Sequence, residues 1–166
     1  DTPSLVYVRT GGEIRDQGYR TLAEVLDSLP GTHPRYDRLY GYTGVRGISR
    51  PGDYSSRLLL LLDGVRVNDA IYDSATGGPE FPVDIGLIDR VEYIPGPGSV
   101  LYGSNAVLGV VNVITRSASQ LAGVNVVADL ASGADRKLAV TWGGDLGPAR
   151  VLLGMASQRV RGNERL

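Results

Sequence analysis

The chain has 166 residues, 17 basic and 18 acidic side chains, a net charge of −1 and no cysteine. This length fits one domain with a buried core, and the balanced charge excludes a field strong enough to recruit nucleic acid or an anionic membrane surface. The absence of cysteine excludes disulfide scaffolds, thiolate metal sites and cysteine nucleophiles, while 23 glycines and 9 prolines indicate many turns between short strands.

The first part of the chain predicts one strand and two short helices. Residues 4–8 (SLVYV) have the composition of a strand. A T-x-x-E pattern, the signature of a capping box at a helix start, begins at Thr10 and again at Thr21. The second helix covers residues 21–29, because its apolar residues recur on one face before a Pro-Gly pair ends it.

The middle of the chain predicts a loop, a strand and a hairpin. Residues 32–42 are polar and aromatic without a clean period and predict a loop, whereas residues 43–48 predict a short strand. Residues 57–68 predict a hairpin, because a leucine run precedes an Asp-Gly pair, which favours a type I′ turn. The uninterrupted leucines 58–62 indicate a strand that is buried on both faces.

Residues 86–116 form the segment that organises the rest of the chain. An alternating stretch at residues 88–94 and a β-branched run at residues 110–115 predict two strands. A crossing marked by proline and glycine joins them, with almost no helical signal between. The segment therefore predicts paired strands around an irregular connection.

The last part of the chain consists of segments of about ten residues separated by turns. Residues 124–131, 136–146 and 150–160 each place apolar side chains on one face. Segments of this length, apolar on one side, are typical of a transmembrane β-barrel. The same pattern also fits an antiparallel meander in a soluble sheet, so periodicity leaves both readings open.

Five motifs in one order resemble the plug domain of TonB-dependent outer-membrane receptors. The motifs are a first strand, TLAEVLDSLPG at residues 21–31, GVRGI at 44–48, LLLDGVRVN at 60–68, and a final segment that contains RVEYI, YGSNA and GVVNVITR and ends at Arg116. Each motif alone is weak, but their common order covers residues 5–116. The chain is identified as a member of this family.

The resemblance implies an α+β fold. A plug domain with a small mixed sheet and short helices would occupy residues 1–116, and residues 117–166 would be the first antiparallel strands of a transmembrane barrel of about 22 strands. Because 166 residues are too few for such a barrel, we expect the N-terminal part of a longer receptor. We expect it in the bacterial outer membrane, with the plug inside the barrel.

The same resemblance implies a transport function without an enzyme activity, a cofactor or a resident metal. The plug would gate the barrel during active uptake of a scarce nutrient such as siderophore-bound iron, haem, cobalamin or a similar chelate. Its partners would be its own barrel and the TonB protein, which pairs by strand addition with a coupling box expected upstream of Asp1. The alternative is a free-standing plug-like interaction module in the periplasm.

The resemblance also assigns site residues. Three apical loops would carry the ligand contacts, and strand-like segments would carry charges that contact the barrel. The predicted ligand-binding residues are Tyr36, Asp37, Arg38, Tyr40, Arg50, Asp53, Tyr54, Asn68, Tyr72 and Asp73. The predicted plug–barrel contacts are Arg46, Arg90 and Glu92, although Pro95 stands where many family members carry a second arginine for this contact.

Other kinds of site fit the sequence poorly. A Gly-x-Gly at residues 96–98 has proline in its middle and no amphipathic helix behind it, unlike a dinucleotide-binding loop. His33 is the only histidine, which argues against zinc and against a catalytic triad. Asp69, Asp73 and Glu80 do not have the spacing of an EF-hand calcium loop.

Overall fold

The structure of the protein is a computed structural model that describes residues 5–36, 41–48, 55–78, 80–97, 105–130 and 136–159. The chain divides into two compact units, Asp1–Thr115 and Arg116–Leu166, which are described separately. Among the described residues, no helix is both long and apolar enough to cross a membrane.

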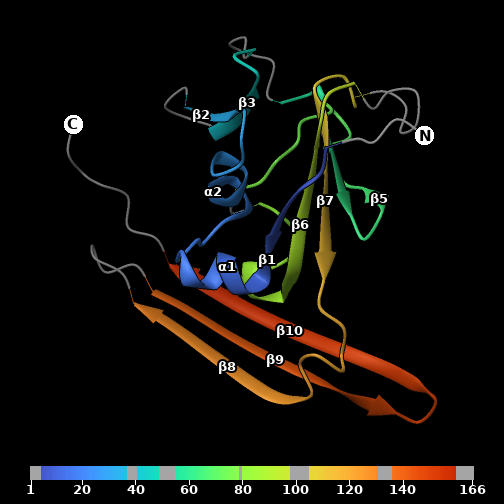
Figure 1. The fold of residues 1–166 in the computed structure, drawn as a ribbon. Helices are drawn as coiled ribbons and strands as arrows, with labels where there is room; N and C mark the ends of the chain where they lie inside the picture. Colours follow the sequence, from blue (N-terminus) through green and yellow to red (C-terminus); the bar gives the residue numbers. More distant parts are fainter. Residues whose placement is uncertain are drawn as a thin grey trace. The chain divides into compact units, whose positions relative to one another are not determined.

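The first unit contains a five-stranded mixed sheet in the order β1-β6-β7-β4-β5 (Figure 1). Only the contact between β4 and β7 is parallel, and the other neighbours are antiparallel. The two strands expected within residues 86–116 are therefore adjacent. The strands are β1 (Tyr7–Thr10), β4 (Leu58–Leu62), β5 (Val65–Arg66), β6 (Ile88–Pro95) and β7 (Gly109–Thr115), and a short 3-10 helix, η1 (Ile85–Leu87), precedes β6.

Two short helices follow β1, as the T-x-x-E patterns predicted. Helix α1 (Gly11–Asp16) begins with a complete capping box, in which the Glu13 carboxylate accepts the Thr10 N–H at 2.8 Å. Helix α2 (Leu22–Asp27) is capped by Thr21, but Glu24 accepts the N–H of Arg20 at 2.6 Å. The first strand, expected at residues 4–8, is shifted toward the C-terminus. Strand β1 begins at Tyr7, which pairs with Tyr93 of β6.

The core lies between the sheet and these helices. Leu60, Val91 and Val111 are fully buried there with Val25 of α2. Gly109 allows the Tyr93 ring to pack closely, since a side chain at Gly109 would collide with that ring. The opposite face of β4 is buried as well, with Leu59 in a second cluster. Strand β4 is thus buried on both faces, as the leucine run predicted.

The Asp-Gly turn of the predicted hairpin joins β4 to β5. Asp63 and Gly64 both have positive φ angles, 49° and 81°, as a type I′ turn requires. The Asp63 carboxylate also accepts hydrogen bonds from the backbone N–H and the hydroxyl of Thr115, each at 2.8 Å. These bonds fix the hairpin turn to the end of β7.

The prediction of a loop at residues 32–42 was wrong. The chain forms a two-stranded hairpin of β2 (Thr32–Tyr36) and β3 (Gly41–Val45). The His33 ring fills the space that a side chain at Gly44 would need, and the Thr32 hydroxyl donates to Leu26 O at 2.6 Å. Backbone pairing and local polar bonds stabilise this hairpin. It therefore does not need alternating apolar residues, which are the pattern that would have predicted strands.

The second unit is a three-stranded antiparallel sheet in the order β10-β9-β8. Its strands are β8 (Gly123–Leu130), β9 (Arg136–Leu146) and β10 (Ala149–Arg159). Cross-strand rows on one face are apolar, such as Val126–Val140–Met155. The other face is mixed: it has polar or small rows such as Asn125–Thr141–Gly154, but it also carries Val127 and Leu152.

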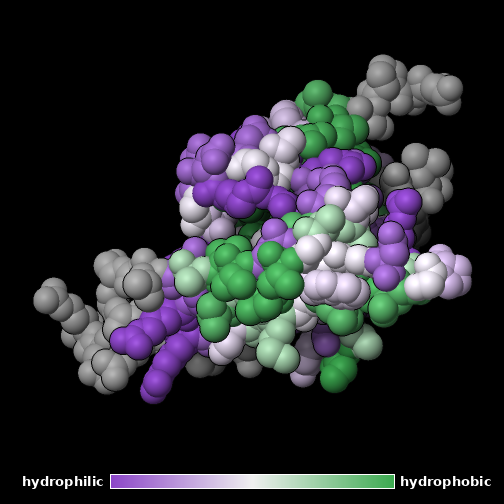
Figure 2. Space-filling model, turned by 90° about the horizontal axis from the view of Figure 1, so that it is seen from below, coloured by the Kyte–Doolittle hydropathy of each residue, from purple (hydrophilic) through white to green (hydrophobic). Residues whose placement is uncertain are grey.

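The apolar face of this three-stranded sheet is largely exposed within the described chain. Met155 is 79% exposed, Val124 69% and Val126 62%. Figure 2 shows hydrophobic side chains gathered in patches on the face of the molecule that it draws. A surface of this kind marks contact with another apolar surface or with lipid.

Candidate functional site

The structure describes only part of the predicted ligand-binding set. Tyr36 lies at the end of β2, and its side chain is outside what the structure describes. Asn68, Tyr72 and Asp73 lie in the segment after β5 and are described. The predicted ligand residues that fall outside the described ranges are Asp37, Arg38, Tyr40, Arg50, Asp53 and Tyr54.

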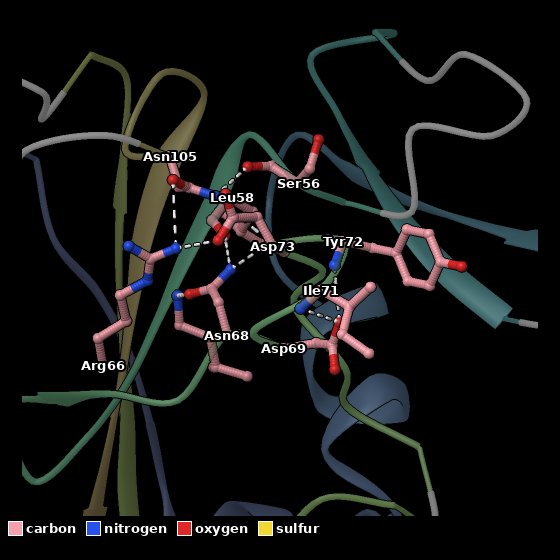
Figure 3. Close-up of polar contacts among 10 residues, drawn as sticks. Ser56, Leu58, Arg66, Asn68, Asp69, Ile71, Tyr72, Asp73 and Asn105 are labelled. Carbon is pink, nitrogen blue, oxygen red and sulfur yellow. Dashed lines mark hydrogen bonds and ion pairs between the residues drawn. The ribbon is translucent and has the colours of Figure 1, made fainter.

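The side chain of Asn68 links the segment after β5 to strand β4 (Figure 3). Its Nδ2 donates to Leu58 O and to Asp73 O, each at 2.9 Å. Its Oδ1 accepts the N–H of Leu60 at 2.8 Å. Both amide hydrogens and the amide oxygen are therefore engaged by the backbone of the protein.

Arg66 and Asn105 reach the same segment from two other parts of the chain. The Arg66 guanidinium forms an ion pair with the Asp73 carboxylate and donates to Asn105 Oδ1 at 3.4 Å. Asn105 Nδ2 donates to Ser56 O at 2.7 Å and to Asp73 O at 3.4 Å. Asp73 and Asn105 both have positive φ angles, 56° and 75°, which asparagine and aspartate tolerate better than most residues.

The tip of the segment is a turn stabilised by Asp69. Its Oδ1 accepts the N–H groups of Ile71 at 3.0 Å and of Tyr72 at 2.8 Å, the pattern of an Asx turn. The side chains of Ile71 and Tyr72 are 80% and 69% exposed. In Figure 3 the Tyr72 ring points away from the group of Arg66, Asn68, Asp73 and Asn105. The turn thus presents two large side chains at the surface.

The far end of the segment is fixed to α2. Gly77 O accepts the N–H of Ala23 at 2.7 Å, and a side chain at Gly77 would meet the α2 backbone. Asp69 N also donates to Ser74 O at 2.9 Å. The segment from residue 67 to residue 78 is therefore anchored at both ends and cross-linked within itself.

The residues predicted to contact a barrel lie on the first unit. Arg90 Nε donates to the Glu92 carboxylate at 2.8 Å, and Arg90 also pairs with Asp89 at 3.2 Å. The hydrogen bond to Glu92 raises the pKa of Arg90. Glu92 lines an open groove of about 430 Å³ on the sheet face that also carries Leu59 and Ile94. Arg90 and Glu92 therefore neutralise each other locally.

Arg46 occupies the turn after β3. Its φ of 53° is left-handed, and its N–H donates to Gly31 O at 2.7 Å. Burial raises the pKa of Tyr93, and the nearby charge of Arg46 offsets part of that rise. The Tyr93 hydroxyl is buried and has no hydrogen-bond partner among the described residues, while its ring stacks on Tyr7.

Among the described residues of this site, no side chains are arranged as a catalytic group. Within the described ranges, no cluster of three or more histidine, cysteine, aspartate or glutamate residues could hold a metal ion. What the arrangement can do is hold a loop in one shape and present side chains from it.

Sequence reasoning missed part of this arrangement. Arg66, Asn105 and Ile71 were not among the predicted site residues, although Arg66 and Asn105 stand inside two of the quoted motifs. Asparagine at a left-handed position was the available signal for Asn105, but its partners lie 49 and 32 positions away. A bond over such separations cannot be read from local pattern.

Comparison with known proteins identifies similar sequences. A family model described as the TonB-dependent receptor plug domain matches residues 1–110. The vitamin B12 transporter BtuB of Vibrio vulnificus is 39% identical over 127 residues, which is 74% of this chain and 19% of that protein. BtuB of Vibrio cholerae serotype O1 is 34% identical over 161 residues, 93% of this chain and 25% of that protein. The chain thus spans about a fifth to a quarter of these relatives.

Solved structures share the fold. The ferripyoverdine receptor of the outer membrane of Pseudomonas aeruginosa has a TM-score of 0.74 and 21% identity over 95% of this chain and 20% of that one. The ferric-catecholate import receptor Fiu of E. coli has a TM-score of 0.71 and 23% identity over 95% of this chain and 21% of that one. These neighbours confirm the predicted fold, a mixed sheet with short helices followed by antiparallel strands. The matched proteins are transporters and receptors, in agreement with the prediction that the chain is not an enzyme.

Proposed function

This chain belongs to the family of TonB-dependent receptor plug domains, and from that premise we propose that it closes and gates the barrel of an outer-membrane receptor for nutrient uptake. The first unit would be the plug, and β8, β9 and β10 would be the first strands of the barrel. The exposed apolar face of these three strands carries this proposal, because the described chain gives it no apolar cover. The barrel strands and lipid would supply that cover.

The ligand that we propose to test first is cobalamin. The relatives at 39% and 34% identity are named vitamin B12 transporters. The solved receptors for iron chelates are 21% and 23% identical, which supports the fold but carries less weight for the ligand. A ferric siderophore, haem or a similar chelate is the competing class. The apical loops, including the predicted residues outside the described ranges, would contribute the contacts from the plug.

The energy for uptake would come from the TonB protein. It would pair by strand addition with a coupling box upstream of Asp1 and pull on the chain that leads into β1. Among the described residues, β1 is an edge strand of the five-stranded sheet and pairs with β6. It is therefore the strand of the sheet that a force on the preceding chain would reach first.

The plug would be retained in the barrel by polar contacts in addition to packing. Arg46, Arg90 and Glu92 are proposed to contact barrel residues. Arg90 and Glu92 have exposed side-chain fractions of 41% and 28%, so both can exchange part of their mutual pairing for partners on a surrounding wall. The groove beside Glu92 supplies apolar surface for the same contact.

Uptake by the full-length receptor tests the proposal. Cells that express it are expected to accumulate radiolabelled cyanocobalamin, and deletion of the TonB protein should abolish accumulation while leaving binding at the cell surface. An excess of a ferric catecholate should not compete. Uptake that persists without TonB would contradict the transport mechanism. Competition by the ferric catecholate but not by unlabelled cyanocobalamin would assign the ligand to the iron-chelate class.

A further inference from the structure

Hydrogen bonds and an ion pair connect the segment after β5 to three other parts of the chain. Asn68 ties it to β4, Arg66 reaches it from β5, and Asn105 reaches it from the connection that precedes β7. All three meet at Asp73, whose carboxylate pairs with Arg66 and whose carbonyl accepts from both asparagines. Such convergence on one loop residue fixes the position of the loop relative to the sheet.

We propose that Arg66, Asn68, Asp73 and Asn105 form a positioning clamp, and that the Ile71–Tyr72 turn which the clamp holds is the part of this segment that touches ligand. The proposal rests on the proposed function as a receptor. It gives Asn68 and Asp73 a role different from the predicted one, since they act through the turn. It adds Ile71 as a contact residue and Arg66 and Asn105 as positioning residues.

The clamp residues are poorly suited to direct ligand contact. Both Nδ2 hydrogens and the Oδ1 of Asn68 are engaged, so a ligand bond would have to replace a bond to the backbone. The Asp73 carboxylate is matched by the Arg66 guanidinium. A ligand that took either partner would leave the other charge unpaired, which weakens binding.

The turn, in contrast, places two large side chains at the surface. Ile71 and Tyr72 are largely exposed, and the Asp69 carboxylate accepts hydrogen bonds from their backbone N–H groups. A large side chain on a fixed turn offers contact area without the ordering cost that a mobile loop would add. An isoleucine beside a tyrosine suits an organic ligand with an apolar face, such as a large chelate, in preference to a bare ion.

Binding measurements on the full-length receptor in detergent, with cyanocobalamin as the probe, test the contact role. Replacing both contact residues (Ile71→Ala with Tyr72→Ala) should raise Kd by about tenfold or more. Arg66→Ala should raise Kd by about tenfold in the natural background but have little effect once both contacts are removed. Arg66→Lys should restore part of the affinity, and Arg15→Ala on α1 serves as the matched control. An equal loss from Arg66→Ala in both backgrounds would overturn the proposal, because Arg66 would then contact the ligand itself.

A measurement without ligand tests the clamp. A spin label at Ile71→Cys, in a receptor with no other cysteine, should give a broad spectrum, and Arg66→Ala or Asn105→Ala should sharpen it. Arg66→Lys should reverse part of the change. Equal label mobility in all variants would overturn the clamp. If cyanocobalamin fails to bind the unmodified receptor while the mobility differences are present, the proposed ligand is wrong and the clamp stands.

Discussion

The five-stranded and the three-stranded sheet of this chain differ in how far they bury their apolar side chains. In the five-stranded sheet, β4 is buried on both faces, with Leu59 and Leu60 each at most 2% exposed. In the three-stranded sheet, Val126 and Met155 lie on a face that is mostly exposed. A sheet that carries its own helices can bury its apolar residues, whereas one without such a layer needs a cover from elsewhere.

The two units of the chain differ in what stabilises them. The first unit has its own hydrophobic core, to which α1, α2 and the sheet all contribute. The second unit has strands of eight to eleven residues that are paired to each other but carry an unpartnered apolar face among the described residues. Under the proposed function, the cover is lipid on that face and neighbouring barrel strands at the edges.

A cavity in the first unit should have the largest effect. Leu60→Ala removes a fully buried side chain between the sheet and the helices. We expect the free energy of opening of β7 to fall by about 2–5 kcal/mol, as in other buried leucine-to-alanine changes. Native-state hydrogen exchange at the amides of Val111 and Val113 in the full-length receptor measures this change.

Val140→Ala in β9 is the matched control for the buried site. Val140 is 40% exposed, so truncation leaves no closed cavity and should change the opening free energy of β9 by less than about 1 kcal/mol. Similar losses at Leu60 and Val140 would break the comparison, because both strands would then be packed in the same way.

A smaller effect should come from Asp27, the one half-buried carboxylate at the end of α2. Burial raises the pKa of Asp27, although a hydrogen bond from the Thr43 hydroxyl at 3.3 Å partly opposes this. The folded protein therefore binds the proton of the Asp27 carboxyl group more tightly than the unfolded chain does. The contribution of Asp27 to stability is present below the unfolded carboxyl pKa of about 3.9 and is lost as the pH rises through its raised folded value.

Asp27→Asn tests that sign. The amide can still accept from Thr43 but carries no charge, so at pH 7 the variant should protect the β3 amides slightly more than the natural protein does. The difference should vanish near pH 4. Hydrogen exchange of both proteins at the same pH provides the measurement. A variant that is less protected at pH 7 would show that the ionised carboxylate stabilises the hairpin.

Local chemistry in the sequence was enough to predict several elements. Thr10 and Thr21 mark helix starts because capping uses residues three positions apart, and the turn at Asp63 follows from two neighbouring φ angles. The β2–β3 hairpin was missed because it depends on His33 packing over Gly44 and on side-chain bonds to α2.

The candidate site was less predictable for the same reason. Tyr72 was predicted from its loop position, and the structure describes it as exposed. The bonds that hold its loop join residues as far apart in the sequence as Ser56 and Asn105. No local sequence pattern predicts such bonds. The roles of Asn68 and Asp73 depend on those bonds, which only the folded chain supplies.

The exposed face of the second unit provides the most direct test of the account. Single spin labels can be placed in turn at residues 138 to 141 of β9, in the full-length receptor reconstituted in lipid vesicles and otherwise free of cysteine. Labels at Leu138 and Val140 should be relaxed by lipid-soluble oxygen, and labels at Ala139 and Thr141 should not. Such a period of two would place the apolar face of β8–β10 in the bilayer. Equal access of a water-soluble relaxation agent to all four positions would contradict the account, because the strands would then form an ordinary soluble sheet.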